Sequence, residues 1–329
     1  MRAALTGATG LLGANLAAAL IARGWSVTAT RRARSDARAL DDLPITWVEA
    51  SLDDTEGLTR AFDGADAVFH CAAMVTLRRA IRPEVRAANV VGTANVLAAA
   101  ARAGSGRLVH VSTAAAVGLG EGGAPADETA TYNFEREGLD DAYSLTKHEA
   151  EGLALAAAAS GQDVVVVNPT FMFGPRDIRP SSGRVILEIA AGKLPALPVG
   201  SNCFVHVADV CEGMILAFER GARGERYILG GENRRWADLL QGIGRALGVK
   251  TTSWVAPTWL TGAVGLAGDL GQWVSGRELT INSMAVRWSN TRNFTFTSEK
   301  ARTSLGYSWR DPDRGVEDAI AWFRANGRL

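Results

Sequence analysis

Short apolar runs alternate with longer Ala-rich stretches along the first half of the chain. The runs are residues 3–5, 27–30, 45–48, 67–70, 108–111 and 164–167. Several of them are rich in β-branched residues, whereas alanine between them favours helix. This alternation predicts βα units and a parallel sheet, in which the four consecutive valines of 164–167 form a strand buried on both faces.

The pattern changes after Pro169, where Gly and Pro break the chain into loops and short helices. Residues 204–207 predict a strand that returns to the sheet. Asp209 and Glu212 have the spacing of an N-cap and N3 pair, which predicts a helix over 210–218. A final amphipathic helix is expected around 315–325.

Residues 254–273 are apolar and contain three tryptophans. The segment also contains Pro257, Gly262, Gly265, Gly268 and Asp269, which argue against a membrane span. We therefore expect helices that cover an apolar cavity or a partner, and contact with a membrane surface is the less favoured alternative.

Charge and cysteine content exclude several classes of protein. The 329 residues include 35 basic and 35 acidic side chains, so no basic excess favours nucleic acid. Cys71, Cys203 and Cys211 lack metal-ligand spacing and cannot form a disulfide framework. The first strand begins within three residues of the N-terminus, which leaves no room for a secretory signal. We expect a cytoplasmic protein with no metal site and no nucleic-acid partner, and membrane contact remains the less favoured alternative.

A glycine-rich loop follows the first apolar run. Its sequence is TGATGLLG over residues 6–13, and an Ala-rich helical pattern begins directly after it. A strand, a glycine loop and a helix in this order bring backbone N–H groups and a positive helix end to one point, which suits a pyrophosphate. Gly7 permits the tight turn, Gly10 the approach of phosphates and Gly13 close packing of the helix on the sheet.

The residues after the second apolar run bear on which dinucleotide is bound. NAD is usually held by a carboxylate about 20 residues beyond the glycine loop, whereas the 2′-phosphate of NADP favours a guanidinium. The first acidic residue of the chain is Asp36, and Arg31 and Arg32 precede it. We expect NADP with these two arginines as its clamp, and a solvated basic turn is the alternative.

Tyr143 and Lys147 stand four residues apart at the start of a predicted helix over 143–159. Residues with this spacing share one helix face, so the ammonium lies beside the phenol. Because a fixed positive charge favours phenolate, we expect a lowered Tyr143 pKa and a role in proton transfer. An exposed amphipathic helix is the structural alternative.

The run 108–111 delivers Ser112 and Thr113 to the edge where parallel sheets bind ligands.

Together these motifs resemble the extended short-chain dehydrogenase/reductases of the NAD-dependent epimerase/dehydratase family, and within them the dihydroflavonol reductase-like branch. The resemblance covers essentially the whole chain and rests on the loop 6–13 and the segments 70–73, 89–93, 112–113, 143–147, 168–175, 204–210 and 305–307. It implies an α/β fold: a Rossmann doubly wound parallel sheet with a smaller C-terminal α+β substrate domain. The implied NADP-binding domain is 1–170 plus about 203–230, and the substrate-binding domain is about 171–202 and 231–329.

The resemblance also implies roles for individual residues. Tyr143 is the acid/base, Lys147 bridges phenol and nicotinamide ribose, Thr113 takes the serine/threonine position, and Asn89 takes that of the assisting asparagine. The implied cofactor contacts are Gly7, Thr9, Gly10, Leu11, Leu12, Gly13, Arg31, Arg32, Leu52, Ala72, Ala73, Val111, Tyr143, Lys147, Pro169 and Phe171. The expected substrate contacts are Met74, Ala114, Thr170 and Arg176. Ser51 replaces the aspartate that the family usually has near adenine.

Two enzymatic functions compete within this family. Nucleotide-sugar epimerases and dehydratases hold a diphosphate, and Asn202 stands where they usually have an arginine. We therefore favour NADPH-dependent reduction of a ketone or aldehyde in a neutral or apolar small molecule. A protein that only senses NADP would not need Tyr143 and Lys147. Ala-rich helices pair across a dimer axis in this family, so we expect a homodimer.

Overall fold

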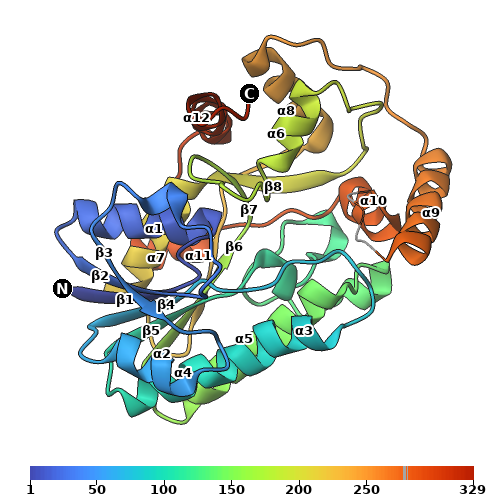
Figure 1. Ribbon diagram of the computed structural model, residues 1–329. Helices are drawn as coiled ribbons and strands as arrows, with labels where there is room; N and C mark the ends of the chain where they lie inside the picture. The colour runs from blue at the N-terminus through green and yellow to red at the C-terminus, as the bar shows by residue number, and fades with distance from the viewer. Residues whose placement is uncertain (277–278, 280) are drawn as a thin grey trace.

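The computed structural model describes residues 1–276, 279 and 281–329. Its centre is a seven-stranded parallel sheet (Figure 1). In spatial order the strands are β3 (Ile45–Glu49), β2 (Ser26–Arg31), β1 (Arg2–Thr6), β4 (Ala67–His70), β5 (Arg107–Val111), β6 (Val164–Pro169) and β9 (Arg226–Leu229). The chain order reverses between β1 and β4, and doubly wound sheets bind ligands at the carboxyl ends of such strands. The predicted α/β class is confirmed.

Helices cover both faces of this sheet (Figure 1). One face carries α1 (Leu11–Ala22), α7 (Val207–Arg220) and α11 (Glu299–Leu305), and the other carries α2 (Thr55–Phe62), α4 (Gly92–Arg102) and α5 (Ala142–Ala159). Successive strand residues enter opposite cores, as Leu108 and Val109 do, because side chains alternate along a strand. Short elements in the connections are η1 (Arg38–Leu40), α3 (Pro83–Arg86), the π-helix η2 (Ala87–Val91), η3 (Ala114–Ala116), η4 (Glu121–Gly123) and η5 (Phe134–Glu137).

A smaller sheet contains β10 (Glu232–Arg235), β8 (Ser201–His206) and β7 (Phe171–Phe173), in that order. It packs with α6 (Arg184–Ala190), α8 (Trp236–Leu247) and α12 (Pro312–Ala325) around Phe173, Phe204 and Phe323. The expectation that 204–207 returns to the large sheet is wrong. β8 pairs instead with β7 and β10, and β9 takes the place beside β6.

Helix α7 begins three residues earlier than its acidic residues suggest. His206 is the N-cap, because its Nδ1 accepts a hydrogen bond from the Ala208 N–H at 2.9 Å. Asp209 is therefore not the cap. Its carboxylate accepts hydrogen bonds from the backbone N–H and the Nε of Arg310, at 2.9 and 2.8 Å, and so ties α7 to the segment before α12.

Helices α9 (Thr258–Ser275) and α10 (Ser283–Asn290) form a pair at the edge of the molecule (Figure 1). Trp259, Leu266 and Trp273 of this Trp-rich segment are exposed, so these side chains do not close over an interior cavity, and the other expectation, that the segment covers a partner, stays a prediction. Within the described part of the chain, no helix is both long and apolar enough to cross a bilayer.

Candidate active site

The glycine loop between β1 and α1 is packed so tightly that side chains would not fit. Gly7 has a φ of 74°, and a Cβ there would lie 2.5 Å from the backbone N of Ala72. A Cβ on Gly13 would lie 2.3 Å from the Gly7 carbonyl oxygen. Gly10 is the N-cap of the 12-residue α1, without a side-chain cap and without an acidic residue in the first turn. These features fit a pyrophosphate at the helix N-terminus.

Arg31 and Arg32 stand at the carboxyl end of β2, and both are exposed. The Arg31 guanidinium lies 5.0 Å from the centre of the Trp47 ring, which orients it by a cation–π contact. Among the described residues, neither guanidinium pairs with a carboxylate. Both positive charges therefore remain available to a phosphate next to this strand.

Helix α5 carries Tyr143 and Lys147 at its start, where the carboxylate of Asp141 caps it through the Ser144 N–H at 2.7 Å. Lys147 is buried, and its Nζ donates a hydrogen bond to the carbonyl oxygen of Val111 at 2.7 Å. Thr113 follows β5, and its side chain lies close enough to the Tyr143 phenol to act on the pKa of that phenol. The structure thus brings together three of the four residues expected to be catalytic.

The pKa of Tyr143 does not move in the expected direction. Burial raises it to about 12, and the Thr113 side chain beside the phenol opposes only part of this effect. The lowering expected from the spacing is wrong because the Lys147 ammonium is directed to Val111. Burial also lowers the pKa of Lys147 to about 8, while the Glu151 carboxylate acts to raise it. Uncharged phenol is therefore the resting form near neutral pH.

Asn89, the fourth residue, is buried in the π-helix η2 and holds a loop. Its Oδ1 accepts a hydrogen bond from the Met74 N–H at 2.7 Å, and its Nδ2 donates to the Met74 carbonyl oxygen at 2.9 Å. The same Nδ2 lies 3.0 Å from the Thr146 Oγ1 on α5. Asn89 therefore fixes the loop after β4 relative to the helix that carries Tyr143.

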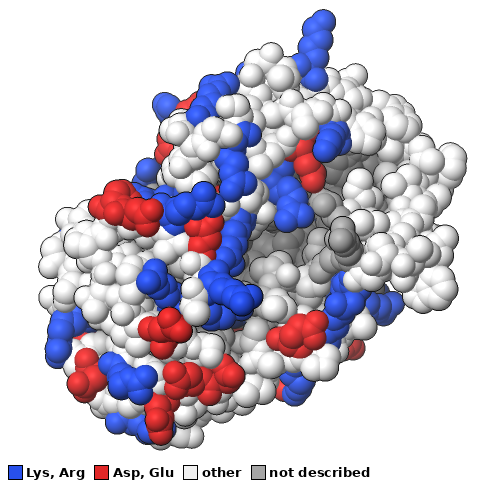
Figure 2. All heavy atoms as spheres, viewed as in Figure 1, with Lys and Arg blue, Asp and Glu red and all other residues white. Residues whose placement is uncertain are grey.

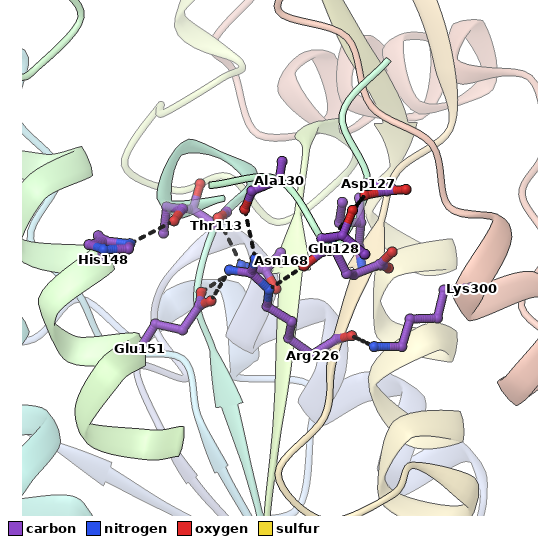
Figure 3. A network of polar contacts seen from close by, with 12 residues as sticks. Thr113, Asp127, Glu128, Ala130, His148, Glu151, Asn168, Arg226 and Lys300 are labelled. Carbon is purple, nitrogen blue, oxygen red and sulfur yellow. Dashed lines mark hydrogen bonds and ion pairs between the residues drawn. The ribbon is translucent and has the colours of Figure 1, made fainter. Parts of the chain in front are cut away.

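A buried polar network lies behind Thr113, and the sequence reasoning missed it (Figure 3). The Glu151 carboxylate accepts hydrogen bonds from Asn168 Nδ2 at 2.7 Å and Arg226 Nη1 at 2.9 Å. Asn168 Nδ2 also donates to the Thr113 carbonyl oxygen at 3.1 Å. Arg226 Nη2 donates to the Glu128 carbonyl oxygen at 2.6 Å. The network joins α5, β6, β9 and the segment around residue 128 to the backbone of Thr113.

Two buried histidines on neighbouring strands were also missed. His70 and His110 are register partners on β4 and β5, and their rings lie 5.4 Å apart. His70 contacts Thr6 Oγ1 at 2.7 Å and Thr93 Oγ1 at 3.1 Å. Burial, with the nearby Lys147 charge as a smaller cause, lowers the pKa of His70 to about 3 and that of His110 well below its usual value. Both rings are neutral at physiological pH.

The remaining expected cofactor contacts have different surroundings. Ala72 packs against Gly7, and Ala73 beside it is exposed. Leu52 packs against Gly92 of α4, and its carbonyl oxygen accepts a hydrogen bond from Asn95. The Phe171 ring packs edge-on against Trp236 in the core of the small sheet. The positions Thr9, Leu11, Leu12, Val111 and Pro169 lie on the loop after β1, the start of α1 and the ends of β5 and β6.

The four expected substrate contacts do not form one surface. Ala114 and Thr170 are buried. Arg176, with a φ of 66°, pairs with Asp42 at 2.7 Å and donates to the Ala39 carbonyl oxygen, so its charge is used within the fold. Of the four, only Met74 has an exposed side chain. The described residues contain no cluster of His, Cys, Asp and Glu that could hold a metal ion.

Comparisons with known proteins agree with this geometry. Residues 3–230 match the NAD dependent epimerase/dehydratase family. A protein of Synechocystis sp. assigned as dihydroflavonol 4-reductase is 35% identical over 98% of this chain and 94% of its own length. Sterol demethylase protein B of Methylococcus capsulatus is 36% identical, with 100% of both chains covered.

A solved structure extends the likeness to three dimensions. The crystal structure of a nucleoside-diphosphate-sugar epimerase from Pseudomonas aeruginosa matches with a TM-score of 0.80 and 30% identity, covering 100% of this chain and 99% of that one. Sequence and fold therefore agree over the full length. The chain belongs to the NAD-dependent epimerase/dehydratase family of extended short-chain dehydrogenase/reductases, whose members use NAD or NADP.

Proposed function

We propose that this protein uses NADPH to reduce a ketone or aldehyde of a neutral or apolar small molecule to an alcohol. The observation that carries the proposal is the placement of the Thr113 side chain beside the half-buried, protonated phenol of Tyr143, with the Lys147 ammonium one helical turn away. The Synechocystis relative assigned as a reductase supports the same class of reaction here.

The chain's own groups have distinct tasks in this reaction. NADPH, when bound, supplies a hydride to the carbonyl carbon. The hydroxyls of Thr113 and Tyr143 hold the carbonyl oxygen and stabilise the negative charge that develops on it. Tyr143 then donates its proton to that oxygen. Lys147, whose ammonium is bound to the Val111 carbonyl oxygen, would hold the nicotinamide ribose beside the phenol, as the family resemblance implies. A pKa raised to about 12 suits this direction, because a reductase needs its phenol protonated at the start.

Preference for NADPH rests on Arg31 and Arg32. Their guanidinium groups have no carboxylate partner among the described residues, and they stand where a 2′-phosphate would approach the end of β2. A guanidinium binds phosphate through paired, charge-assisted hydrogen bonds, whereas a ribose hydroxyl gains much less from it.

Nucleotide-sugar epimerisation or dehydration is the second candidate, and the Pseudomonas aeruginosa structure supports it through its 30% identity. One contact argues against it. Asn202 is buried, and its Oδ1 accepts a hydrogen bond from the Cys203 N–H at 2.8 Å, so it offers a diphosphate no positive charge.

The experiment that tests the proposal is a turnover assay with the purified protein, NADPH and a panel of aromatic and alicyclic ketones and aldehydes. We expect NADPH consumption and the matching alcohol. Turnover of nucleotide-sugars without consumption of reduced cofactor would establish the second candidate instead. Tight NADPH binding without turnover of either panel would identify a protein that only senses the cofactor.

We also infer a homodimer formed through α4 and α5, which pack side by side on one face of the sheet. On α4 the exposed positions Ala94, Ala98 and Ala101 recur at helical spacing, and alanine permits two helices to approach closely. Ala98→Glu should convert a dimer to a monomer in sedimentation velocity. A dimer of unchanged stability would place the interface elsewhere.

A further inference from the structure

Helix α9 has its apolar face turned outward. Trp259, Leu266, Leu270 and Trp273 are 73%, 67%, 61% and 81% exposed. These positions recur every three, four or seven residues, so they form one stripe along the helix. We call these four residues the α9 stripe. A stripe this exposed is unusual, because the apolar face of a surface helix normally packs on the core.

The inward face of α9 is small and polar, and it is well packed. A Cβ on Gly265 would lie 2.8 Å from the Cα of Ser283, and one on Gly268 would lie 2.1 Å from the Ile281 carbonyl oxygen. The Asp269 carboxylate accepts a hydrogen bond from the Ser283 N–H at 3.1 Å. These contacts fix the rotation of α9 about its axis, and they hold the α9 stripe away from the protein.

The surroundings of the stripe carry positive charge. A groove of about 680 Å³ lies between α9 and α10, and it is lined by Trp259 and Leu266 on one side and by the exposed Arg287 and Arg292 on the other. Glu137 is the one acidic residue in its lining, and within the described chain neither guanidinium is bonded to a carboxylate. Over α9 itself the surface in Figure 2 shows no charged side chain.

The far end of α9 adjoins a further basic segment. Arg78 donates a hydrogen bond to the carbonyl oxygen of Gly276, at 3.3 Å, directly after the helix ends. Val75 in the same segment is an exposed apolar residue. The loop after β4 therefore brings one arginine to the end of α9 and carries one exposed apolar side chain.

We propose that α9 docks on the surface of a membrane that contains anionic phospholipids. In this arrangement the α9 stripe enters the boundary between headgroups and acyl chains, and Arg287 and Arg292 bind lipid phosphates. Helices with one apolar and one polar face lie in this boundary, and tryptophan is enriched there. Since α9 does not cross the bilayer, the contact runs along its surface.

Charge favours this occupant over a second copy of the chain. Two copies that met through the same face would bring both pairs of guanidinium groups into one interface, with one carboxylate from each copy to offset them. An anionic lipid surface instead offers a phosphate to each guanidinium and apolar chains to the stripe. The proposal does not depend on the reaction proposed above.

The test is co-sedimentation of the full-length protein with vesicles of phosphatidylcholine alone or mixed with phosphatidylglycerol. We expect binding to the mixed vesicles, weakened by salt. Leu270→Glu and Trp273→Glu should each lower the bound fraction by about tenfold or more, and the double variant Arg287→Gln, Arg292→Gln should lose the preference for phosphatidylglycerol. Val249→Glu, which places the same charge on an exposed apolar site near α8, should bind as the parent does.

Circular dichroism and thermal stabilisation by NADPH confirm that each variant is folded, without using turnover. Equal binding by the parent and both stripe variants would overturn the proposal. So would the absence of binding to either vesicle. A self-association in sedimentation velocity that Trp273→Glu abolishes, with no vesicle binding by the parent, would identify a second copy as the occupant.

Discussion

The carboxylate of Glu151 pairs with the guanidinium of Arg226 at 2.9 Å, and the pair lies behind the backbone of Thr113. Both side chains are largely removed from solvent. A buried ion pair adds little to the free energy of unfolding when both partners are present. Removal of one partner lowers that free energy strongly, because the other charge stays buried without a counterion. A substitution that removes only one of the two charges should therefore have the largest effect on stability.

Glu151→Gln should reduce the free energy of unfolding by about 3 kcal/mol, because Arg226 would keep its charge without a counterion. Urea unfolding followed by circular dichroism measures this loss. Glu149→Gln is the matched control on the same helix, since Glu149 pairs with Arg86 at the surface. Its effect should stay within about 0.5 kcal/mol. Equal losses of unfolding free energy for the two substitutions would show that the buried pair contributes no more to stability than the surface pair.

Tyr143→Phe should lower turnover by about 10²- to 10⁴-fold, because the phenol is the only proposed proton donor to the substrate oxygen. NADPH affinity, measured by fluorescence titration, should change little. Tyr227→Phe removes a hydroxyl that accepts a hydrogen bond from the Ala222 N–H, far from Thr113, and it should retain full activity. Turnover retained in Tyr143→Phe would remove the tyrosine from the mechanism.

Removal of the Arg31 and Arg32 charges should weaken the binding of NADPH much more than the binding of NADH. A loss of about 10- to 100-fold in NADPH affinity corresponds to roughly 1.4–2.8 kcal/mol, the range of one or two charge-assisted hydrogen bonds. Arg34→Ala, an exposed arginine of the same turn, is the control. Calorimetric titration measures the affinity for both cofactors. Equal losses of affinity for NADPH and NADH would contradict the phosphate clamp.

His70 and His110 should make the protein acid-sensitive. Burial lowers the pKa of His70 to about 3 and that of His110 well below its usual range, so both stay neutral while the unfolded chain takes up protons below about pH 6.5. Because the unfolded state binds more protons, the free energy of unfolding falls as the pH decreases. Near pH ~5 the expected loss is about 2 kcal/mol for each histidine, measurable by urea unfolding.

His110→Leu isolates one of these two contributions. No ring nitrogen of His110 has a hydrogen-bond partner among the described residues, so the substitution breaks no bond and removes one proton uptake on unfolding. The free energy of unfolding should then fall less steeply as the pH decreases. The same acid dependence in parent and His110→Leu would assign the effect to other groups.

Local spacing predicts only part of this site. Tyr143 and Lys147 are four residues apart, so their common helix follows from the sequence, and α5 begins at Ala142. Glu151 and Arg226 are 75 residues apart, and their pairing requires β6 and β9 to be neighbours, which no local pattern encodes. The Tyr143 pKa likewise depends on burial, which helix spacing does not reveal.

Two further differences have the same origin. His206, which the sequence places as a partner of the turn before α7, is the N-cap itself, and Asp209 is not. The apolar pattern of α9 predicts a buried face, but Gly265 and Gly268 turn the opposite face toward the protein. Hydrophobic periodicity identifies a face, and tertiary packing decides what that face meets.

Asn89 clasps the peptide of Met74 through both its N–H and its carbonyl oxygen, and leaves the thioether side chain open. The hydrogen bonds that hold position 74 therefore involve only its backbone and do not depend on its side chain. Exchange of the residue at position 74 for another of different size would change the exposed surface of the loop after β4 and would keep both hydrogen bonds between Asn89 and the backbone of that loop. Under the proposed function, a lineage could change what this loop contacts while Asn89, Tyr143 and Lys147 stay as they are.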